Sequence, residues 1–341
     1  MSDDYVVLER LKLAYGETVA VHDLDLAITR GELLALLGPS GCGKTTTMRA
    51  IAGLLAPAAG RIFIDGADVT YTPPSKRNVG LVFQSYALFP HLSVFENVAF
   101  GLRIKREPKP SIDARSRAAL ATVGLEGFAR RNPAELSGGQ QQRLALARSL
   151  VMEPKLLLLD EPLSNLDARL RLEMRTELQR LQLETGVTMV FVTHDQSEAL
   201  ALADRIVVMK DGIAVQTGTP EEIYNRPRDV FVADFVGFDN ILYFRNGMLT
   251  SDFGSTDTGE ELPGSDALAW RPAEVILGSG PMQGRVIGAS FAGQYREYVL
   301  DTGLGKIKAQ APADAPPHTI GGLVAFELPL AKAHRLPGTG K

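Results

Sequence analysis

The chain has 341 residues, 45% of them hydrophobic, which is enough for the buried cores of about two domains. Lys and Arg number 36 against 40 Asp and Glu, and this net charge of −4 argues against a nucleic-acid partner. No apolar run approaches the roughly 18 to 20 residues of a spanning helix, and residues 1–10 lack the basic start and apolar stretch of a secretory signal.

A phosphate-binding loop is predicted between an apolar strand at 32–37 and a helix at 43–52. Its glycines allow backbone N–H groups to turn inward, and the helix dipole is directed at the same point. Taken alone, the segment also fits an ordinary Gly-rich turn. We expect it to bind nucleotide through Gly38, Pro39, Ser40, Gly41, Cys42, Gly43, Lys44, Thr45 and Thr46.

Two side chains of this loop have predicted roles in the chemistry. Lys44 is placed to reach the β- and γ-phosphates, and the Thr45 hydroxyl is placed to ligate Mg²⁺. Cys42 is the only cysteine, which excludes an internal disulfide and fits a reducing cytoplasm.

A mainly helical insert is expected at about 86–153, after a strand at 79–83 that leads into Gln84. Within the insert, Ser137 precedes Gln140 by three residues and fits a capping box that opens a helix at 141–150. Gly138 and Gly139 leave the N–H groups at this helix start uncovered, which favours an anion site. The alternative is simply a well-capped helix, and Gln84 by itself is an exposed loop residue.

Four leucines at 156–159 predict a second buried strand that ends in Asp160 and Glu161. Open α/β sheets bind ligands at the carboxyl ends of such strands. We expect Asp160 to hold Mg²⁺ and Glu161 to act as the general base, although the pair could also merely begin a turn. His194 ends the next apolar strand, at 188–193, and a lone histidine there is usually structural.

An amphipathic helix is predicted at 167–183. Its apolar residues recur every three or four positions, so we expect them to face the core: Leu170, Met174, Leu178 and Leu181.

Together these motifs resemble the ATPases of ABC transporters, most closely at Leu136–Arg143, Leu-Ser-Gly-Gly-Gln-Gln-Gln-Arg. The resemblance implies an α/β P-loop NTPase fold of the ABC type with a helical subdomain, ATP and Mg²⁺ as cofactors, and two nucleotides between two head-to-tail copies. Catalysis is assigned to Glu161, His194 and Lys44. The metal ligands are Thr45, Gln84 and Asp160.

The resemblance also implies contacts with a second subunit and with the adenine ring of ATP. The signature residues would bind the γ-phosphate held by the other subunit, and they are Ser137, Gly138, Gly139 and Gln140. Asp167 would lie at the dimer interface, in a segment that begins at Ser164. Tyr15 would stack on adenine, while a strand tyrosine facing the core is the alternative.

After residue 235 the chain changes to short apolar runs separated by Gly, Pro, Asp and Ser, which predicts small antiparallel β-structure. Residues 236–341 resemble the OB-like TOBE domain of importer ATPases, and residues 1–235 form the expected nucleotide-binding domain. Ala273 stands where that domain usually has glutamate, so no ligand role is transferred to it.

This resemblance predicts the ATPase of a binding-protein-dependent importer, peripheral to the cytoplasmic face of a bacterial inner membrane. Its partners would be two transmembrane permease subunits, a periplasmic or extracellular binding protein and a second copy of itself. The segment at 82–102 resembles polyamine, phosphonate and ferric-iron importers more than sugar importers. The alternatives are a sugar importer, an exporter, and a soluble ABC ATPase of repair or translation.

Overall fold

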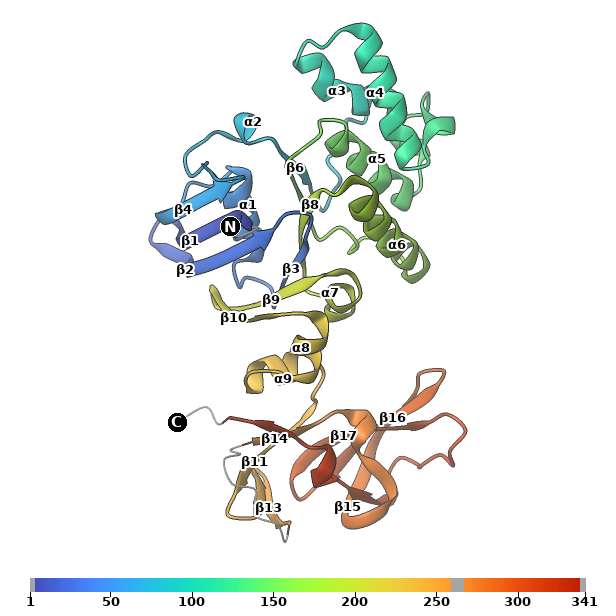
Figure 1. Ribbon diagram of the computed structural model, residues 1–341. Helices are drawn as coiled ribbons and strands as arrows, with labels where there is room; N and C mark the ends of the chain where they lie inside the picture. Colours follow the sequence, from blue (N-terminus) through green and yellow to red (C-terminus); the bar gives the residue numbers. More distant parts are fainter. Residues whose placement is uncertain (1–3, 259–266, 338–341) are drawn as a thin grey trace. The chain divides into compact units, whose positions relative to one another are not determined.

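The computed structural model describes residues 4–258 and 267–337, and the chain divides into two compact units, Met1–Glu221 and Glu222–Lys341 (Figure 1). The first unit contains both α-helices and β-strands, and the second is mainly antiparallel β-structure. Among the described residues, no helix has the length and apolar character needed to span a bilayer.

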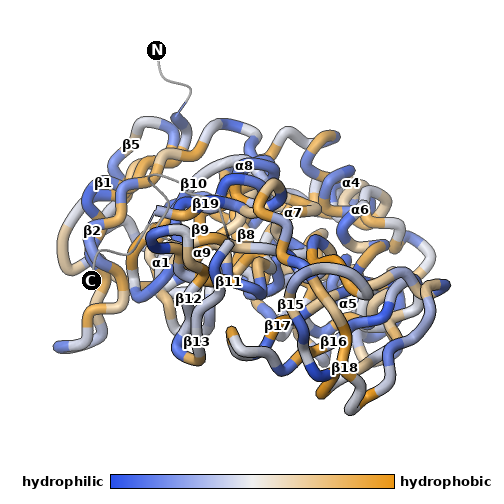
Figure 2. The backbone as a smooth tube through the Cα atoms, turned by 90° about the horizontal axis from the view of Figure 1, so that it is seen from below, coloured by the Kyte–Doolittle hydropathy of each residue, from blue (hydrophilic) through white to orange (hydrophobic). Residues whose placement is uncertain are grey.

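A six-stranded sheet in the order β10-β9-β3-β8-β7-β6 forms the centre of the first unit. Its strands are β3 (Leu33–Leu37), β6 (Val79–Val82), β7 (Leu156–Asp160), β8 (Thr188–Thr193), β9 (Arg205–Lys210) and β10 (Ile213–Gly218). All are parallel except β10, which pairs antiparallel with β9. Every residue of β3 and β8 is buried, which explains their apolar sequences. Figure 2 colours the backbone by hydropathy, and β8 is labelled there.

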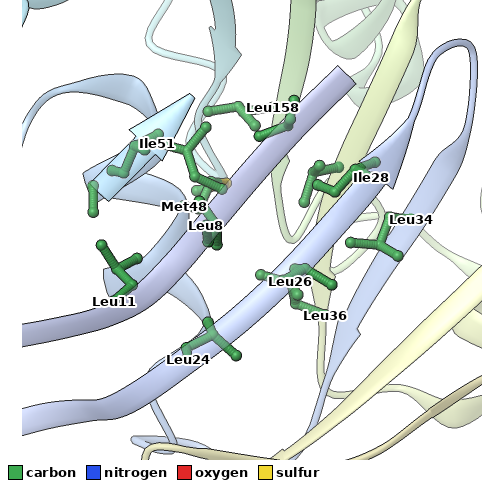
Figure 3. Packing of buried hydrophobic residues seen from close by; sticks show 14 of the residues in the cluster. Leu8, Leu11, Leu24, Leu26, Ile28, Leu34, Leu36, Met48, Ile51 and Leu158 are labelled. Carbon is green, nitrogen blue, oxygen red and sulfur yellow. The ribbon is translucent and has the colours of Figure 1, made fainter. Parts of the chain in front are cut away.

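A second, antiparallel sheet in the order β2-β1-β4-β5 packs beside it. Its strands are β1 (Asp4–Tyr15), β2 (Thr18–Thr29), β4 (Ala59–Ile64) and β5 (Ala67–Asp68). Helix α1 (Lys44–Ala52) follows β3 and contributes Met48 and Ile51 to the shared core. Figure 3 shows this core, in which the labelled strand residues are Leu8, Leu11, Leu24, Leu26, Ile28, Leu34, Leu36 and Leu158.

The segment between β6 and β7 is mainly helical, as predicted. It contains α3 (Val94–Ile104), α4 (Lys109–Thr122), the 3-10 turns η1 (Glu126–Phe128) and η2 (Pro133–Glu135), and α5 (Gly138–Leu150). A short helix, α2 (Pro74–Arg77), precedes β6, and α6 (Ala168–Thr185) and α7 (Gln196–Leu202) flank β8 in sequence. In α6, Met174, Leu178 and Leu181 are buried as predicted.

Leu170 differs from this expectation, because it is only partly buried. It lies near the start of α6, where its side chain comes close to Gly139 at the start of α5.

The second unit begins within the short helix α8 (Pro220–Asn225), at Glu222, and a second short helix, α9 (Val230–Phe235), follows. One five-stranded sheet follows, formed by β11 (Asn240–Arg245), β12 (Met248–Ser251), β13 (Gly254–Asp257), β14 (Ala267–Trp270) and β19 (His334–Leu336). A four-stranded sheet completes it, formed by β15 (Ile276–Phe291), β16 (Tyr295–Thr302), β17 (Gly305–Pro312) and β18 (Leu323–Glu327). The 3-10 turns are η3 (Pro272–Glu274) and η4 (Leu330–Lys332).

The sequence analysis placed the domain boundary at 235, whereas the two compact units divide after Glu221. Arg271 contacts residues on both sides of position 235. The Arg271 guanidinium carbon lies 3.7 Å from the ring centre of Tyr224 in α8 and 3.8 Å from that of Phe238. These stacked contacts connect α8 with the segment after β14.

Candidate functional site

The loop between β3 and α1 requires glycine for two different reasons. Gly41 has open space around it but a φ of 83°, which side-chain-bearing residues rarely adopt. Gly43, with a φ of 102°, is also sterically confined, because a Cβ there would lie 2.7 Å from the carbonyl oxygen of Ala20 in β2. The loop is therefore held in one conformation, against the β1–β2 hairpin.

The start of α1 has the features that favour binding of an anion. Gly43 is its N-cap residue and provides no side-chain cap, and the first turn contains no acidic residue. Lys44 is buried inside the loop, where its Nζ donates hydrogen bonds to the carbonyl oxygens of Gly38 at 2.7 Å and Pro39 at 2.8 Å. Uncapped N–H groups, the helix dipole and this ammonium together favour binding of phosphate.

Thr45 and Asp160 meet at the edge of this loop. The Thr45 Oγ1 donates a hydrogen bond of 3.2 Å to Asp160 Oδ1, which joins α1 to the end of β7. Burial raises the pKa of the Asp160 carboxyl above its ordinary value, and the nearby Glu161 charge adds to the rise. One hydroxyl and one desolvated carboxylate are hard oxygen ligands, and Mg²⁺ at phosphate sites is usually held by few protein oxygens, so the pair fits this ion.

Glu161 occupies a strained position directly after β7, with a φ of 45°. Its Oε2 accepts a hydrogen bond of 2.9 Å from Gln84 Nε2, and its Oε1 lies 3.1 Å from His194 Nδ1. The carboxylate thus lies between the residues that follow β6 and β8. The sequence analysis named all three residues, and the fold brings them together because β6, β7 and β8 are adjacent and parallel.

Ser164 and Asn165 also belong to this cluster, and the sequence analysis assigned them no role there. Ser164 Oγ donates to the Glu161 carbonyl oxygen at 3.0 Å and accepts from Gln84 Nε2 at 3.2 Å. Asn165 Nδ2 donates to the Gln84 carbonyl oxygen at 2.9 Å. Both residues closely follow Glu161 in the sequence, which indicated that they lie near it. Their partner Gln84 is 80 residues from Ser164 and 81 from Asn165, so only the fold reveals this contact.

The capping box at Ser137 is confirmed. Ser137 Oγ accepts from the Gln140 N–H, and Gln140 Oε1 accepts from the Ser137 N–H at 3.0 Å. Ser137 and Gly138 are exposed. Among the described residues, the side-chain hydrogen bonds of Ser137 and Gln140 remain within this turn, so they do not join the cluster at Lys44, Thr45 and Glu161.

Three further predicted residues lie around these elements. Tyr15 ends β1 and is 49% exposed, so it does not face the core. Asp167 is an exposed N-cap of α6, and its Oδ1 accepts from the Leu170 N–H at 2.9 Å. Cys42 is buried in the phosphate loop with its Sγ 3.7 Å from Lys44 Nζ, and burial raises the pKa of its thiol.

Comparisons with known proteins agree with this geometry. Residues 21–164 match the family described as ABC transporter. The Fe(3+) ions import ATP-binding protein FbpC of Agrobacterium fabrum is 48% identical over 314 residues, which cover 89% of both chains. The spermidine/putrescine import ATP-binding protein PotA of Borreliella afzelii is 46% identical over 290 residues, covering 82% of this chain and 84% of that protein.

A solved structure is also similar. CbiO1 from Clostridium perfringens, described as part of the ABC transporter complex CbiONQ, superposes with a TM-score of 0.62 at 34% identity. The match covers 66% of this chain and 92% of that one.

Proposed function

Because this chain belongs to the ABC transporter family of ATP-binding proteins, we propose that it drives uptake of a cationic cargo of the ferric-ion or polyamine class. It is an ATPase coupled to import. The cargo class rests on the relatives, which are import proteins for Fe(3+) ions and for spermidine and putrescine. These relatives also favour an importer over an exporter or an ATPase of repair or translation.

The position of Glu161 carries the proposed chemistry. Its carboxylate follows β7 immediately after Asp160, whose side chain touches the phosphate loop through Thr45. Glu161 is then placed to take a proton from a water attacking the γ-phosphate, with His194 orienting the carboxylate. Mg²⁺ held by Thr45, Asp160 and Gln84 would neutralise charge on the β- and γ-phosphates.

We propose that ATP closes two copies of the chain head to tail. The α5 start at Ser137 and Gly138 is exposed and separate in hydrogen bonding from the chain's own phosphate loop. The N–H of exposed Gly138 takes no part in the capping box, so it suits a γ-phosphate bound by another copy. Asp167, exposed at the start of α6, would lie in the same interface, and Tyr15 would contact adenine.

The surface for the permease subunits is proposed at Phe83, Phe100 and Ile104. These apolar side chains are 39%, 36% and 67% exposed, and Phe100 and Ile104 are four residues apart on α3. Phe83 directly precedes Gln84, so a partner bound here would touch the chain next to the catalytic cluster. Attachment through permeases would hold the chain at the cytoplasmic face of the membrane, and the second unit would be the TOBE-like domain.

Reconstitution in vesicles tests this function. The chain is combined with permease subunits and a binding protein identified by co-purification. Uptake of labelled ferric iron, spermidine, putrescine, a phosphonate and a disaccharide is then measured. We expect ATP-dependent uptake of ferric iron or of the polyamines. Uptake of only the phosphonate or the sugar would overturn the cargo class.

The proposed surface for the permease subunits is tested with a separate variant in the same vesicles. Ile104→Glu should abolish uptake while the isolated chain retains ATP hydrolysis, because a charge replaces an exposed apolar side chain on α3, a helix that contributes no residue to the phosphate loop. Leu183→Glu is the matched control, since Leu183 is 79% exposed on a different helix, α6. Equal loss of uptake in both variants would argue against a permease surface on α3.

A further inference from the structure

Arg148 joins the helix that starts at Ser137 to the segment that follows Gln84. It lies in the last turn of α5, and its Nη1 donates to the Ala87 carbonyl oxygen at 2.7 Å while its Nη2 donates to the Tyr86 carbonyl oxygen at 2.9 Å. Within residues 4–258 and 267–337, none of the ion pairs involves Arg148. Two backbone carbonyls therefore provide the hydrogen bonds to this partly buried cation.

The two carbonyls belong to a strained turn. Tyr86 and Ala87 have φ values of 61° and 47°, so two consecutive residues with side chains adopt the left-handed region. Tyr86 is buried, and its hydroxyl has no hydrogen-bond partner within the described part of the chain. Such a conformation persists only where its surroundings enforce it, and the paired hydrogen bonds from Arg148 do so.

This turn determines where Gln84 lies. The Tyr86 N–H donates to the Phe83 carbonyl oxygen at 2.8 Å, so Gln84 is enclosed within the turn. The Gln84 side chain reaches Glu161, and its carbonyl accepts from Asn165. A change in the turn would move the amide that contacts the catalytic carboxylate.

We infer that Arg148 is a positioning residue for ATP hydrolysis, which holds the Tyr86–Ala87 turn so that Gln84 meets Glu161. The inference rests on the proposed roles of Gln84 and Glu161. Helix α5 would then connect two proposed sites. Its 13 residues span about 20 Å, from the γ-phosphate contact proposed at Ser137 to the turn at Gln84. Helix α5 packs against β6 beside that turn (Figure 1).

The test compares Arg148→Ala with Arg115→Ala in the full chain. Arg115, on α4, likewise donates to a backbone carbonyl, that of Val151 at 2.7 Å, but it contacts neither Gln84 nor its turn. We expect Arg148→Ala to lower kcat by about tenfold or more with little change in KM for ATP, because small misplacements of reacting groups are costly. Arg115→Ala should retain kcat.

A second substitution separates positioning from general stability. Ala87 is exposed, so Ala87→Gly removes little packing and makes the left-handed conformation accessible at low cost. In the Arg148→Ala background it should restore kcat several-fold. Equal loss of kcat in the Arg115 variant, without rescue by Ala87→Gly, would overturn the inference.

Hydrogen exchange of residues 83–90 gives a readout that does not depend on hydrolysis. Arg148→Ala should exchange faster in this segment, and Arg115→Ala should not. Unchanged exchange would overturn the inference directly. Hydrolysis by Gln84→Ala is measured alongside. If exchange rises in Arg148→Ala but neither that variant nor Gln84→Ala hydrolyses ATP more slowly, then Arg148 does hold the turn. In that case the proposed catalytic role of Gln84 is wrong.

Discussion

His194 Nδ1 lies 3.1 Å from Glu161 Oε1, so the residue that follows β8 contacts the carboxylate that follows β7. The other oxygen of that carboxylate accepts from Gln84. Both oxygens are therefore engaged by side chains from neighbouring strands. The loops after β6 and β8 therefore both contact the proposed general base directly.

The first prediction concerns Glu161 as the base. Glu161→Gln retains the shape and an oxygen acceptor for Gln84 but removes the basic carboxylate, so hydrolysis should fall by about 100-fold or more. Mg·ATP should still bind, and the ATP-dependent dimer should accumulate. Phosphate release and size-exclusion chromatography measure the two effects, with Glu184→Gln on the surface of α6 as the control. Near-normal phosphate release would rule Glu161 out as the base.

The second prediction separates nucleotide binding from dimerisation. Lys44→Ala removes the ammonium inside the phosphate loop and its hydrogen bonds to Gly38 and Pro39, so ATP affinity itself should fall. Ser137→Arg places a bulky side chain over the α5 start, so ATP should bind normally while dimerisation is lost. Titration with a fluorescent ATP analogue and light scattering distinguish the two variants. If both lose nucleotide equally and both still dimerise, the head-to-tail arrangement is wrong.

The local motifs were predictable because each depends on a short stretch of chain. Apolar runs at 33–37 and 156–159 became buried parallel strands, and the spacing of Ser137 and Gln140 predicted their capping box. The proximity of Gln84, Glu161 and His194 could be expected only from the resemblance to ABC transporter ATPases. Strand order is decided by long-range pairing, which no short pattern contains.

Other contacts could not be predicted from the sequence because they also join residues far apart in the chain. The contacts of Asn165 with Gln84 and of Arg148 with the Tyr86–Ala87 turn join residues 81 and 61 or 62 positions apart. The left-handed φ values of Tyr86 and Ala87 contradict local preference, since neither residue type favours them. Tertiary contacts impose this turn, so propensity alone predicts against it.

The third prediction is a pH dependence that arises from Asp160. Burial raises the pKa of its carboxyl in the folded chain above the ordinary value of 3.8, so the folded state binds more protons than the unfolded state between the two values. The free energy of unfolding therefore falls as pH rises through that window. Asp160→Asn removes the destabilising effect of the buried charged carboxylate. Without nucleotide, the Tm of this variant should therefore exceed that of the wild type at neutral pH.

The difference between Asp160→Asn and the wild type should vanish as pH falls below 3.8, where the aspartate is protonated in both states. Stabilisation by Mg·ATP should also shrink in this variant, because a proposed metal ligand is lost. Calorimetry across this pH range measures both effects, with Asp113→Asn at a partly exposed position of α4 as the control. A lower Tm than wild type at neutral pH would show that the charge of Asp160 stabilises the fold.

The last prediction concerns the second unit, which we expect to take no part in the chemical step. All residues assigned to ATP lie between Tyr15 and His194, within the unit that ends at Glu221. A truncated protein of residues 1–221 should therefore bind and hydrolyse Mg·ATP.

The position of the cut matters, because Tyr224 stacks on Arg271 and most of α8, Glu222–Asn225, belongs to the second unit. A protein of residues 1–235 loses Arg271 but keeps Tyr224, so it should aggregate more readily than residues 1–221 through newly exposed apolar surface. Light scattering and circular dichroism establish that each fragment is folded and dispersed before ATP turnover is compared with the full chain. A folded 1–221 fragment that fails to bind ATP would show that the second unit completes the nucleotide site.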